Sequence, residues 1–325
     1  MKMAIRDYVQ LMRPYQWYKN LLVFVAIVFV EIPKQWPWET LPAIFNFWKY
    51  YPPLILGFLV FCAVSSAGYV LNDVQDLEKD AAHPEKRNRP LPSGRASKGK
   101  AVTLALVLLA VGLVSAYVLN GVFFMLVLLY IINSQAYNFY LRNKAVIDVV
   151  TIAVGFIVRA IAGTFLIHVP FTSWLVIGVF FVALVLGFGK RKNELQLLGD
   201  LAPQHKAVFW EYTDDMLNHG ITMAATWVVM FYALYCYENF RDVMNTQPVM
   251  MTVPIVAGIV MRYVYLLESG SPIGRKPHLA LKDNVMLAGL VLFGLVLIWT
   301  LFFWQPVMEF FMALFPPLFP LTPPP

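Results

Sequence analysis

The sequence predicts an all-α, polytopic membrane protein, and three observations predict it. Hydrophobic residues make up 59% of the 325-residue chain and charged residues only 14%, a composition too apolar for an ordinary soluble domain. Several apolar runs approach the ~20 residues with which an α-helix crosses a bilayer. Lysine and arginine collect on one side of those runs. We expect a single transmembrane domain over residues 1–325, and we see no pattern of a cleavable signal peptide.

Hydropathy predicts about nine membrane helices. They lie near 16–31, 51–72, 101–119, 122–140, 146–167, 173–189, 219–237, 250–267 and 285–304. The first and the sixth are short for a span, so we expect them to be tilted, broken or only partly embedded. The apolar tail 305–325, rich in Phe and Pro, is expected at the membrane interface. Cys62 and Cys236 fall inside apolar runs and are expected to be buried thiols.

Charge sorting gives the orientation. With the N-terminus taken as cytoplasmic, twenty of the 25 Lys and Arg residues fall on that side, against Lys34, Lys49 and Arg241 on the other. Such an excess is typical of cytoplasmic loops. The formal net charge of +6 therefore reports on topology, and we expect no nucleic-acid partner. We expect a multi-pass protein of the cell (inner) membrane, among membrane lipids, with its N-terminus and active site cytoplasmic.

The most informative stretch follows the second predicted helix. Asp73, Asp76 and Asp80 stand at i, i+3 and i+7, a spacing that stacks three carboxylates on one helical face. Like charges so close repel, which favours a cation between them, and oxygen ligands beside a phosphate-bearing substrate suit Mg²⁺. The cations that follow could bind phosphate oxygens; they are Lys86, Arg87 and Arg89. The alternative interpretation is a solvated charged loop.

Two charged residues lie within the fifth predicted helix. Asp148 and Arg159 are eleven residues apart, three turns along one face. An arginine at membrane depth usually points into a bundle or a cavity, so Arg159 has either a role at the site or a structural partner. Small residues follow it and allow close helix packing; they are Ala160, Ala162 and Gly163. Arg262 lies similarly inside the eighth helix.

Other polar residues gather on the same side. Lys190 to Lys192 and Glu194 open the predicted sixth-to-seventh loop, either as a second phosphate-binding shelf or as membrane anchors with a surface ion pair. Lys282 and Asp283 form either a helix start or a further wall of the site. Lys19 is either a snorkelling anchor or a site residue. Tyr137 and Lys144 flank the short fourth-to-fifth loop.

The pattern Asn-Asp-x-x-Asp-x-x-x-Asp at 72–80 resembles the first aspartate-rich motif of the UbiA superfamily. Residues 137–142, Asp148 and 159–163 are also similar to that superfamily's middle region. The resemblance implies an intramembrane enzyme of about nine helices that uses Mg²⁺ to hold a diphosphate. Prenyltransferases of the superfamily carry a second aspartate-rich motif in the sixth-to-seventh loop. Basic residues 190–192 stand there instead.

That replacement resembles the superfamily branch of decaprenyl-phosphate phosphoribosyltransferases, as do residues 16–20, 83–90, 189–195 and 282–283. The resemblance implies that phosphoribosyl pyrophosphate (PRPP) is the donor and a polyprenyl phosphate the acceptor. Diphosphate is released, and the lipid product is a precursor of arabinose donors for the cell wall. The attacking phosphate monoester is already anionic near neutral pH, so no general base is needed.

The resemblance also implies roles for individual residues. Asp73, Asp76 and Asp80 would hold Mg²⁺, and Asp148 would stabilise positive charge at the ribose or orient a hydroxyl. The donor phosphates would contact Asn72, Lys86, Arg87, Arg89, Lys190 and Arg191. The lipid phosphate would meet Arg159 or Lys19, with Tyr137, Lys144, Glu194, Lys282 and Asp283 as accessory residues.

Two other functions remain open from the sequence. An aromatic prenyltransferase would carry an acidic cluster where 190–192 stand, and a transporter would carry polar groups on both membrane sides together with inverted repeats. The acceptor's chain length, the stereochemistry at C1 and the oligomeric state, a homo-oligomer included, are also left open.

Overall fold

The computed structural model describes residues 5–29, 47–82, 86–170, 172–240 and 247–315. Within those ranges every regular element is helical, which confirms the predicted all-α class. The chain forms two compact units, unit 1 with Met1–Glu31 and Ala43–Val179, and unit 2 with Ile32–Pro42 and Phe180–Pro325. The single domain over 1–325 stays a prediction.

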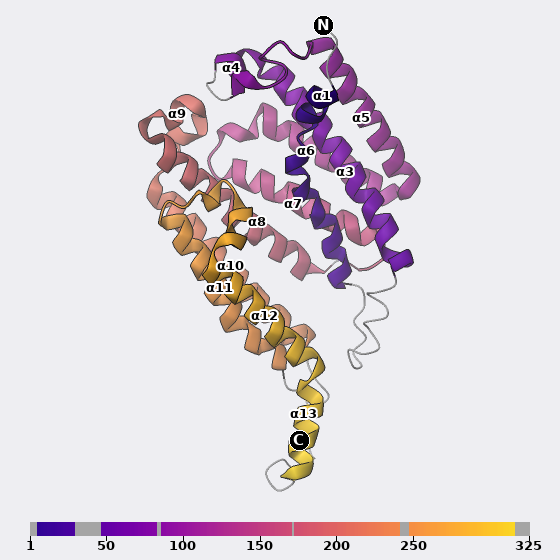
Figure 1. Cartoon of the computed structure of the whole chain (residues 1–325), viewed down its shortest axis with the longest axis vertical. Coiled ribbons are helices and arrows are strands. Elements are labelled where there is room, and N and C mark those ends of the chain that lie inside the picture. The colour runs from indigo at the N-terminus through magenta and orange to yellow at the C-terminus, as the bar shows by residue number, and fades with distance from the viewer. Residues whose placement is uncertain (1–4, 30–46, 83–85, 171, 241–246, 316–325) are drawn as a thin grey trace. The chain divides into compact units, whose positions relative to one another are not determined.

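Unit 1 is a bundle in which neighbouring helices pack pairwise (Figure 1). α3 packs along α5, α6 packs on α7, and α7 packs on η1. Asn120 ends α5 and caps α6, since its Oδ1 accepts from the backbone N–H groups of Val122 and Phe123. The elements of unit 1 are α1 (Ile5–Met12), the 3₁₀ helix η1 (Pro14–Phe29), α3 (Phe47–Gln75), α4 (Leu77–Ala82), η2 (Lys86–Asn88), α5 (Lys98–Leu119), α6 (Gly121–Phe139), η3 (Leu141–Asn143), α7 (Ile147–Leu166) and the start of α8 (Ser173–Leu198).

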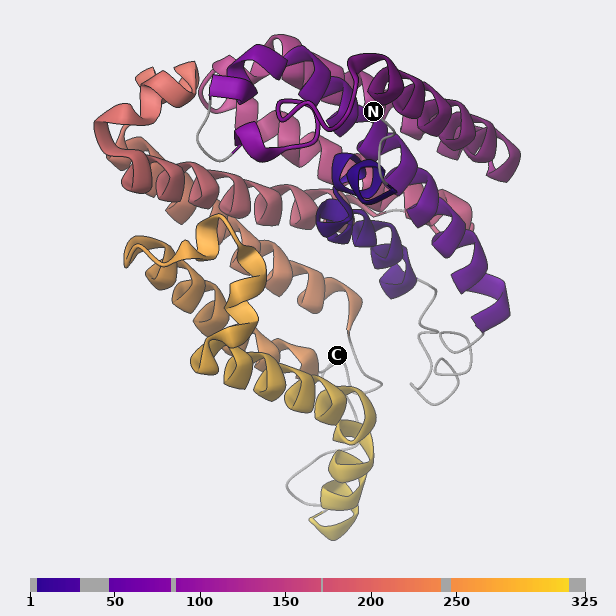
Figure 2. The same cartoon turned by 45° about the horizontal axis from the view of Figure 1, so that its top comes forward.

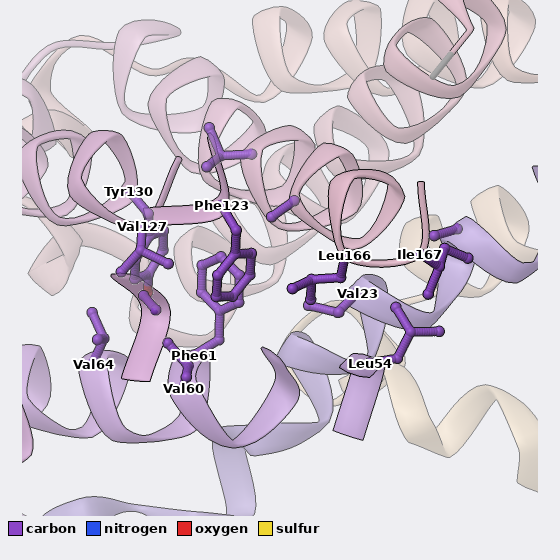
Figure 3. Close-up of a cluster of buried hydrophobic side chains, with 14 of the residues drawn as sticks. Val23, Leu54, Val60, Phe61, Val64, Phe123, Val127, Tyr130, Leu166 and Ile167 are labelled. Atoms are coloured by element: carbon purple, nitrogen blue, oxygen red, sulfur yellow. The ribbon is translucent and has the colours of Figure 1, made fainter. Parts of the chain in front are cut away.

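The core of unit 1 is built around Phe61 of α3 (Figure 3). Its ring lies edge-on to Phe123 and Tyr130, with ring centroids 5.7 and 5.5 Å away. Gly163 of α7 lies against the backbone of η1, because a Cβ there would come 2.0 Å from the Val23 carbonyl oxygen. The close packing predicted from the small residues after Arg159 is therefore confirmed.

The first predicted membrane helix is a 3₁₀ helix. At ~2.0 Å per residue its 16 residues reach about 32 Å, close to the ~30 Å hydrocarbon core, whereas an α-helix of that length would reach about 24 Å. Its buried residues repeat every third position, at Asn20, Val23 and Ala26, as 3.0 residues per turn require. This geometry gives the segment a greater reach than an α-helix of the same length would have.

Unit 2 is built around α11, which packs on both α10 and α12 (Figure 2). Thr213 caps α10 and Asp283 caps α12, each accepting from a backbone N–H in the first turn. Its elements are the rest of α8, η4 (Gly199–Leu201), α9 (Ala202–His205), η5 (Ala207–Trp210), α10 (Asp214–Asn239), η6 (Pro248–Thr252), α11 (Val253–Glu268), η7 (Pro272–Gly274), η8 (Pro277–Lys282), α12 (Asn284–Phe302) and α13 (Trp304–Leu314).

Eight of the helices in the described residues are long and apolar enough to cross a membrane, so the chain is a multi-pass membrane protein. The predicted end of the sixth helix at 189 is wrong, because α8 continues to Leu198. Residues 190–194 are therefore helical rather than loop. In the predicted tail 305–325, residues 305–314 belong to α13 (Trp304–Leu314), and 316–325 lie outside the described residues. Both cysteines are free and buried, as predicted.

Candidate active site

The three motif aspartates lie where α3 passes into α4. Asp73 is in the last turn of α3, Asp76 stands at the junction, and Asp80 is in α4. Backbone hydrogen bonds from Asp76 N to the Asn72 carbonyl and from Asp80 N to the Asp76 carbonyl keep the turns helical. The prediction of one unbroken helical face needs correction, because the regular α-helix is interrupted at Asp76.

Arginines hold two of the aspartates. The side chains of Asp73 and Asp80 are each 3% exposed, and Nη1 of Arg89 donates to both, at 3.0 and 2.8 Å. Arg13, which follows α1, also donates to Asp73 and lies over the ring of Tyr69. The positive charge of the two arginines thus keeps the two carboxylates together. The sequence predicted that some cation would lie between these aspartates.

The third aspartate has a different partner. Arg142 of η3 donates to Asp76 at 3.2 Å, across 66 residues of sequence. Among the described residues, no three acidic, His or Cys side chains come together at distances suited to a metal ion. The Oδ1 atom of Asn72, one residue before Asp73, is buried without a hydrogen-bond partner in the structure. Carboxylate and amide oxygens are the types of ligand that Mg²⁺ prefers, although the three carboxylates are not gathered around one point in the described residues.

The basic residues after the aspartates are distributed unevenly. Arg89 contacts the motif, whereas Arg87 in η2 is exposed. Lys86 begins η2, and 83–85 lie outside the described residues. Of the basic residues predicted there, the structure therefore brings Arg89 against the aspartates.

Arg159 is held by a buried network. Its Nε donates to Asn20 Oδ1 at 2.9 Å, its Nη1 to the Gly155 carbonyl at 3.0 Å, and its Nη2 to the Tyr130 hydroxyl at 2.8 Å. The guanidinium also lies 4.4 Å from the Tyr130 ring centroid. The sequence left two interpretations of Arg159, a role at the site or structural pairing, and these contacts agree with structural pairing.

The remaining predicted residues of unit 1 come from η1, α6, α7 and the end of η3. Asp148 is fully buried in the first turn of α7, where its Oδ1 accepts from the backbone N–H of Val149. Lys19 donates to Gln16 at 2.7 Å. Tyr137 is half-buried in α6, and Lys144 ends η3 with an exposed side chain.

Unit 2 contains a cluster of three cations around one carboxylate, which we call the basic cradle: Lys190, Arg191 and Lys206 around Glu194. Arg191 Nη1 and Lys206 Nζ donate to Oε2 of Glu194 at 2.9 and 2.7 Å, and Lys190 Nζ lies 4.0 Å from Oε1. The Arg191 side chain is 2% exposed, whereas the side chains of Lys190 and Lys206 are each partly exposed and partly buried. The structure thus brings Lys190, Arg191 and Glu194 together, and adds Lys206.

Lys206 experiences the positive charge of this cluster. Loss of water around its ammonium group, with the nearby Arg191 and Lys190, lowers the pKa of Lys206 to about 8. The Glu194 carboxylate favours the charged form but only partly offsets these effects. A negative group that approached Lys206 would raise this pKa again.

Neighbouring polar residues of unit 2 have structural partners. Lys192 donates to Asn218 at 2.5 Å, and Arg275 donates to Asn193 at 2.7 Å. Arg262 pairs with Asp283 at 2.8 Å, and its hydrogen bond lowers the pKa of that carboxyl. Asp283 also caps α12, so the predicted helix start is confirmed, while Lys282 beside it is exposed.

Residues 43–271, more than half of the chain, match the model of the UbiA prenyltransferase family. The chain belongs to that family. This membership confirms the predicted resemblance of the chain to the UbiA superfamily.

Relatives within the UbiA family agree with this assignment. The chain is 30% identical over 293 residues to decaprenyl-phosphate phosphoribosyltransferase of Mycolicibacterium smegmatis, covering 88% of this chain and 89% of the relative. The protein of the same name from Corynebacterium glutamicum is 32% identical to this chain, over 86% of this chain and 81% of the relative's length. A UbiA homolog from Archaeoglobus fulgidus, solved with GPP and Mg²⁺, has a TM-score of 0.63 at 18% identity, over 90% of this chain and 98% of the homolog.

Proposed function

We propose that the protein transfers the 5-phosphoribosyl group of PRPP to a polyprenyl phosphate, such as decaprenyl phosphate, with release of diphosphate. The lipid product would serve as a precursor for cell-wall arabinan. The single observation that carries this choice is the basic cradle of unit 2, at the sequence position where prenyltransferases of the superfamily would carry acids. The names of the mycobacterial and corynebacterial relatives support it.

The aspartate motif is the proposed site of the leaving diphosphate. Asn72, Asp73, Asp76 and Asp80 would hold Mg²⁺, and the A. fulgidus homolog, which was solved with Mg²⁺ bound, supports that choice. Magnesium supplies charge neutralisation for the diphosphate as the C1–O bond breaks. Arg89 lies against the same carboxylates, so its guanidinium is in place to bind diphosphate oxygens.

The donor also carries phosphate away from the diphosphate, and this group needs positively charged side chains of its own. Lys86 and Arg87 would contact further oxygens near the motif, and Lys190 and Arg191 would bind phosphate in unit 2. Asp148, buried at the start of α7, would orient a ribose hydroxyl or stabilise positive charge at C1. The acceptor phosphate, already an anion, attacks C1 from the face opposite the diphosphate.

The proposed acceptor site needs a cation for the lipid phosphate. Lys19 and Arg159 lie on η1 and α7, which pack together. Arg159 donates to Asn20, Gly155 and Tyr130. Lys19 donates to Gln16, so a lipid phosphate bound at either residue would replace an existing contact. Tyr137, Lys144, Glu194, Lys282 and Asp283 remain proposed accessory residues, and the active site is proposed to face the cytoplasm of the cell (inner) membrane.

A donor competition tests the proposal. Purified protein in detergent with Mg²⁺ would receive PRPP labelled in its ribose together with a polyprenyl phosphate, and in a second reaction a polyprenyl diphosphate with hydroxybenzoate. We expect label in the lipid fraction of the first reaction. Product confined to the second reaction would establish an aromatic prenyltransferase instead. An Asp73→Asn variant run beside both serves as the control for Mg²⁺-dependent turnover.

A further inference from the structure

The basic cradle resembles a phosphate site with a carboxylate in the ligand's place. Arg191 and Lys206 donate to the same oxygen of Glu194, and Lys190 approaches the other oxygen. A phosphate group offers three oxygens to donors where a carboxylate offers two. The side chains of Lys190 and Lys206 are 48% and 42% exposed, so a solute can reach the ammonium groups while Arg191 forms the buried floor.

The charge of the cradle indicates which phosphate it suits. A diphosphate commonly binds with Mg²⁺, which calls for several carboxylate ligands, and the cradle has one carboxylate among three cations. A phosphate monoester carries about −1.5 to −2 charges near pH 7 and needs no metal when cations surround it. The cradle therefore fits a monoester better than a diphosphate.

We propose that Lys206, which no sequence pattern assigns, binds a phosphate monoester together with Lys190 and Arg191, and that Glu194 holds the three cations in position until the monoester arrives. The inference rests on the proposed function, since both proposed substrates carry such a group: PRPP as its 5-phosphate and the lipid as its terminal phosphate. It extends that function by naming Lys206 and the chemical class of the bound group.

Binding measurements on the full-length protein in detergent test this inference. Ribose 5-phosphate, a short-chain prenyl phosphate and inorganic pyrophosphate with Mg²⁺ would be titrated by calorimetry against the wild type and three variants. Lys206→Met keeps an aliphatic stem and removes the charge that lies 5.9 Å from the Phe209 ring centroid, and Lys206→Arg keeps the charge. Lys276→Met, at an exposed lysine of the same unit, is the matched control.

We expect Lys206→Met to weaken the binding of ribose 5-phosphate about tenfold, which is the loss expected for one charge-assisted hydrogen bond. The binding of pyrophosphate should be unchanged. Lys206→Arg should restore binding, and Lys276→Met should bind as the wild type does. If Lys206→Met instead weakens binding of the prenyl phosphate, the cradle is still a phosphate monoester site, and its ligand is the acceptor lipid. Unchanged binding of both monoesters, or an equal loss of all three ligands, would overturn the inference. The donor competition reports on the proposed function independently of these results.

Discussion

Arg13 donates a hydrogen bond to Asp73 across sixty residues of sequence and thereby ties the end of α1 to the aspartate motif of α3. The backbone of Arg13 adopts a positive φ of 52°, which is unfavourable for a residue with a Cβ. The Asp73 pair and the stacking on Tyr69 accompany that conformation. Arg13 is therefore a positioning residue for the first motif aspartate.

Replacement of Asp73 by Asn tests the proposed metal ligand at constant volume. We expect Mg²⁺-dependent turnover to be abolished and binding of Mn²⁺, read by electron paramagnetic resonance, to weaken at least tenfold. Since the amide can still accept from Arg13 and Arg89, the variant should remain folded by size-exclusion chromatography and thermal unfolding. Retained activity would remove Asp73 from the metal site.

Arg89 competes with any cation for the same carboxylates. We expect Arg89→Met to bind Mn²⁺ more tightly without substrate, because Asp73 and Asp80 lose their shared guanidinium and repel each other. The same variant should bind pyrophosphate about tenfold more weakly, since one charged donor is lost. Arg95→Met is the matched control, because Arg95 pairs with Asp7 outside the motif. Weaker Mn²⁺ binding in Arg89→Met would contradict this competition.

The close contact between α7 and η1 predicts a stability effect. We expect Gly163→Ala to lower the free energy of unfolding by about 1–3 kcal/mol, because its Cβ would overlap the Val23 carbonyl. Gly178→Ala is the control, since a Cβ at that helical position meets nothing within 4 Å. That change should be neutral or stabilising by up to ~1 kcal/mol. Thermal unfolding in detergent compares the two, and equal midpoints would contradict the packing argument.

The lowered pKa of Lys206 predicts a pH dependence. Below about pH 8 the amine is charged and paired with Glu194, and as pH rises through that value it loses its proton, so monoester binding should fall. Between about 8 and the ordinary value of 10.5 the unfolded chain binds more protons than the native one, so this group makes the free energy of unfolding rise with pH.

Amine labelling followed by mass spectrometry measures that pKa directly. In Glu194→Gln the favourable carboxylate is gone, so half-maximal labelling of Lys206 should move to a lower pH than in the wild type. Movement to a higher pH would show that Glu194 does not stabilise the charged amine. Lys276, labelled in the same samples, is the reference for the reagent.

Much of the fold follows from hydropathy because each long helix here is an apolar run of near-bilayer length. The end of α8 is the exception. Three consecutive cations looked like an interface, yet Arg191 pairs with Glu194 on the helix and is nearly fully buried, so the helix continues. Hydrophobic periodicity does not reveal that a charged residue is buried, because such burial depends on the oppositely charged partner that pairs with it.

Contacts within the candidate site could be predicted for residues that are close in sequence. Contacts between residues that are far apart in sequence could not be predicted. The aspartates and Arg89 fall within one short stretch, so their association could be inferred. Arg13 and Arg142 reach Asp73 and Asp76 across 60 and 66 residues. Lys206 reaches Glu194 across twelve residues of sequence that include η4 and α9. No sequence pattern paired any of these three basic residues with its carboxylate.

The buried network of Arg159 has a consequence for how the chain enters the membrane during synthesis. An arginine at the centre of a membrane helix costs about 2.5–3.5 kcal/mol on insertion. The side-chain partners of Arg159, Asn20 and Tyr130, both precede it in the chain and are therefore synthesised first. When α7 leaves the ribosome, the groups that compensate its charge already exist, so its insertion need not wait for any later segment.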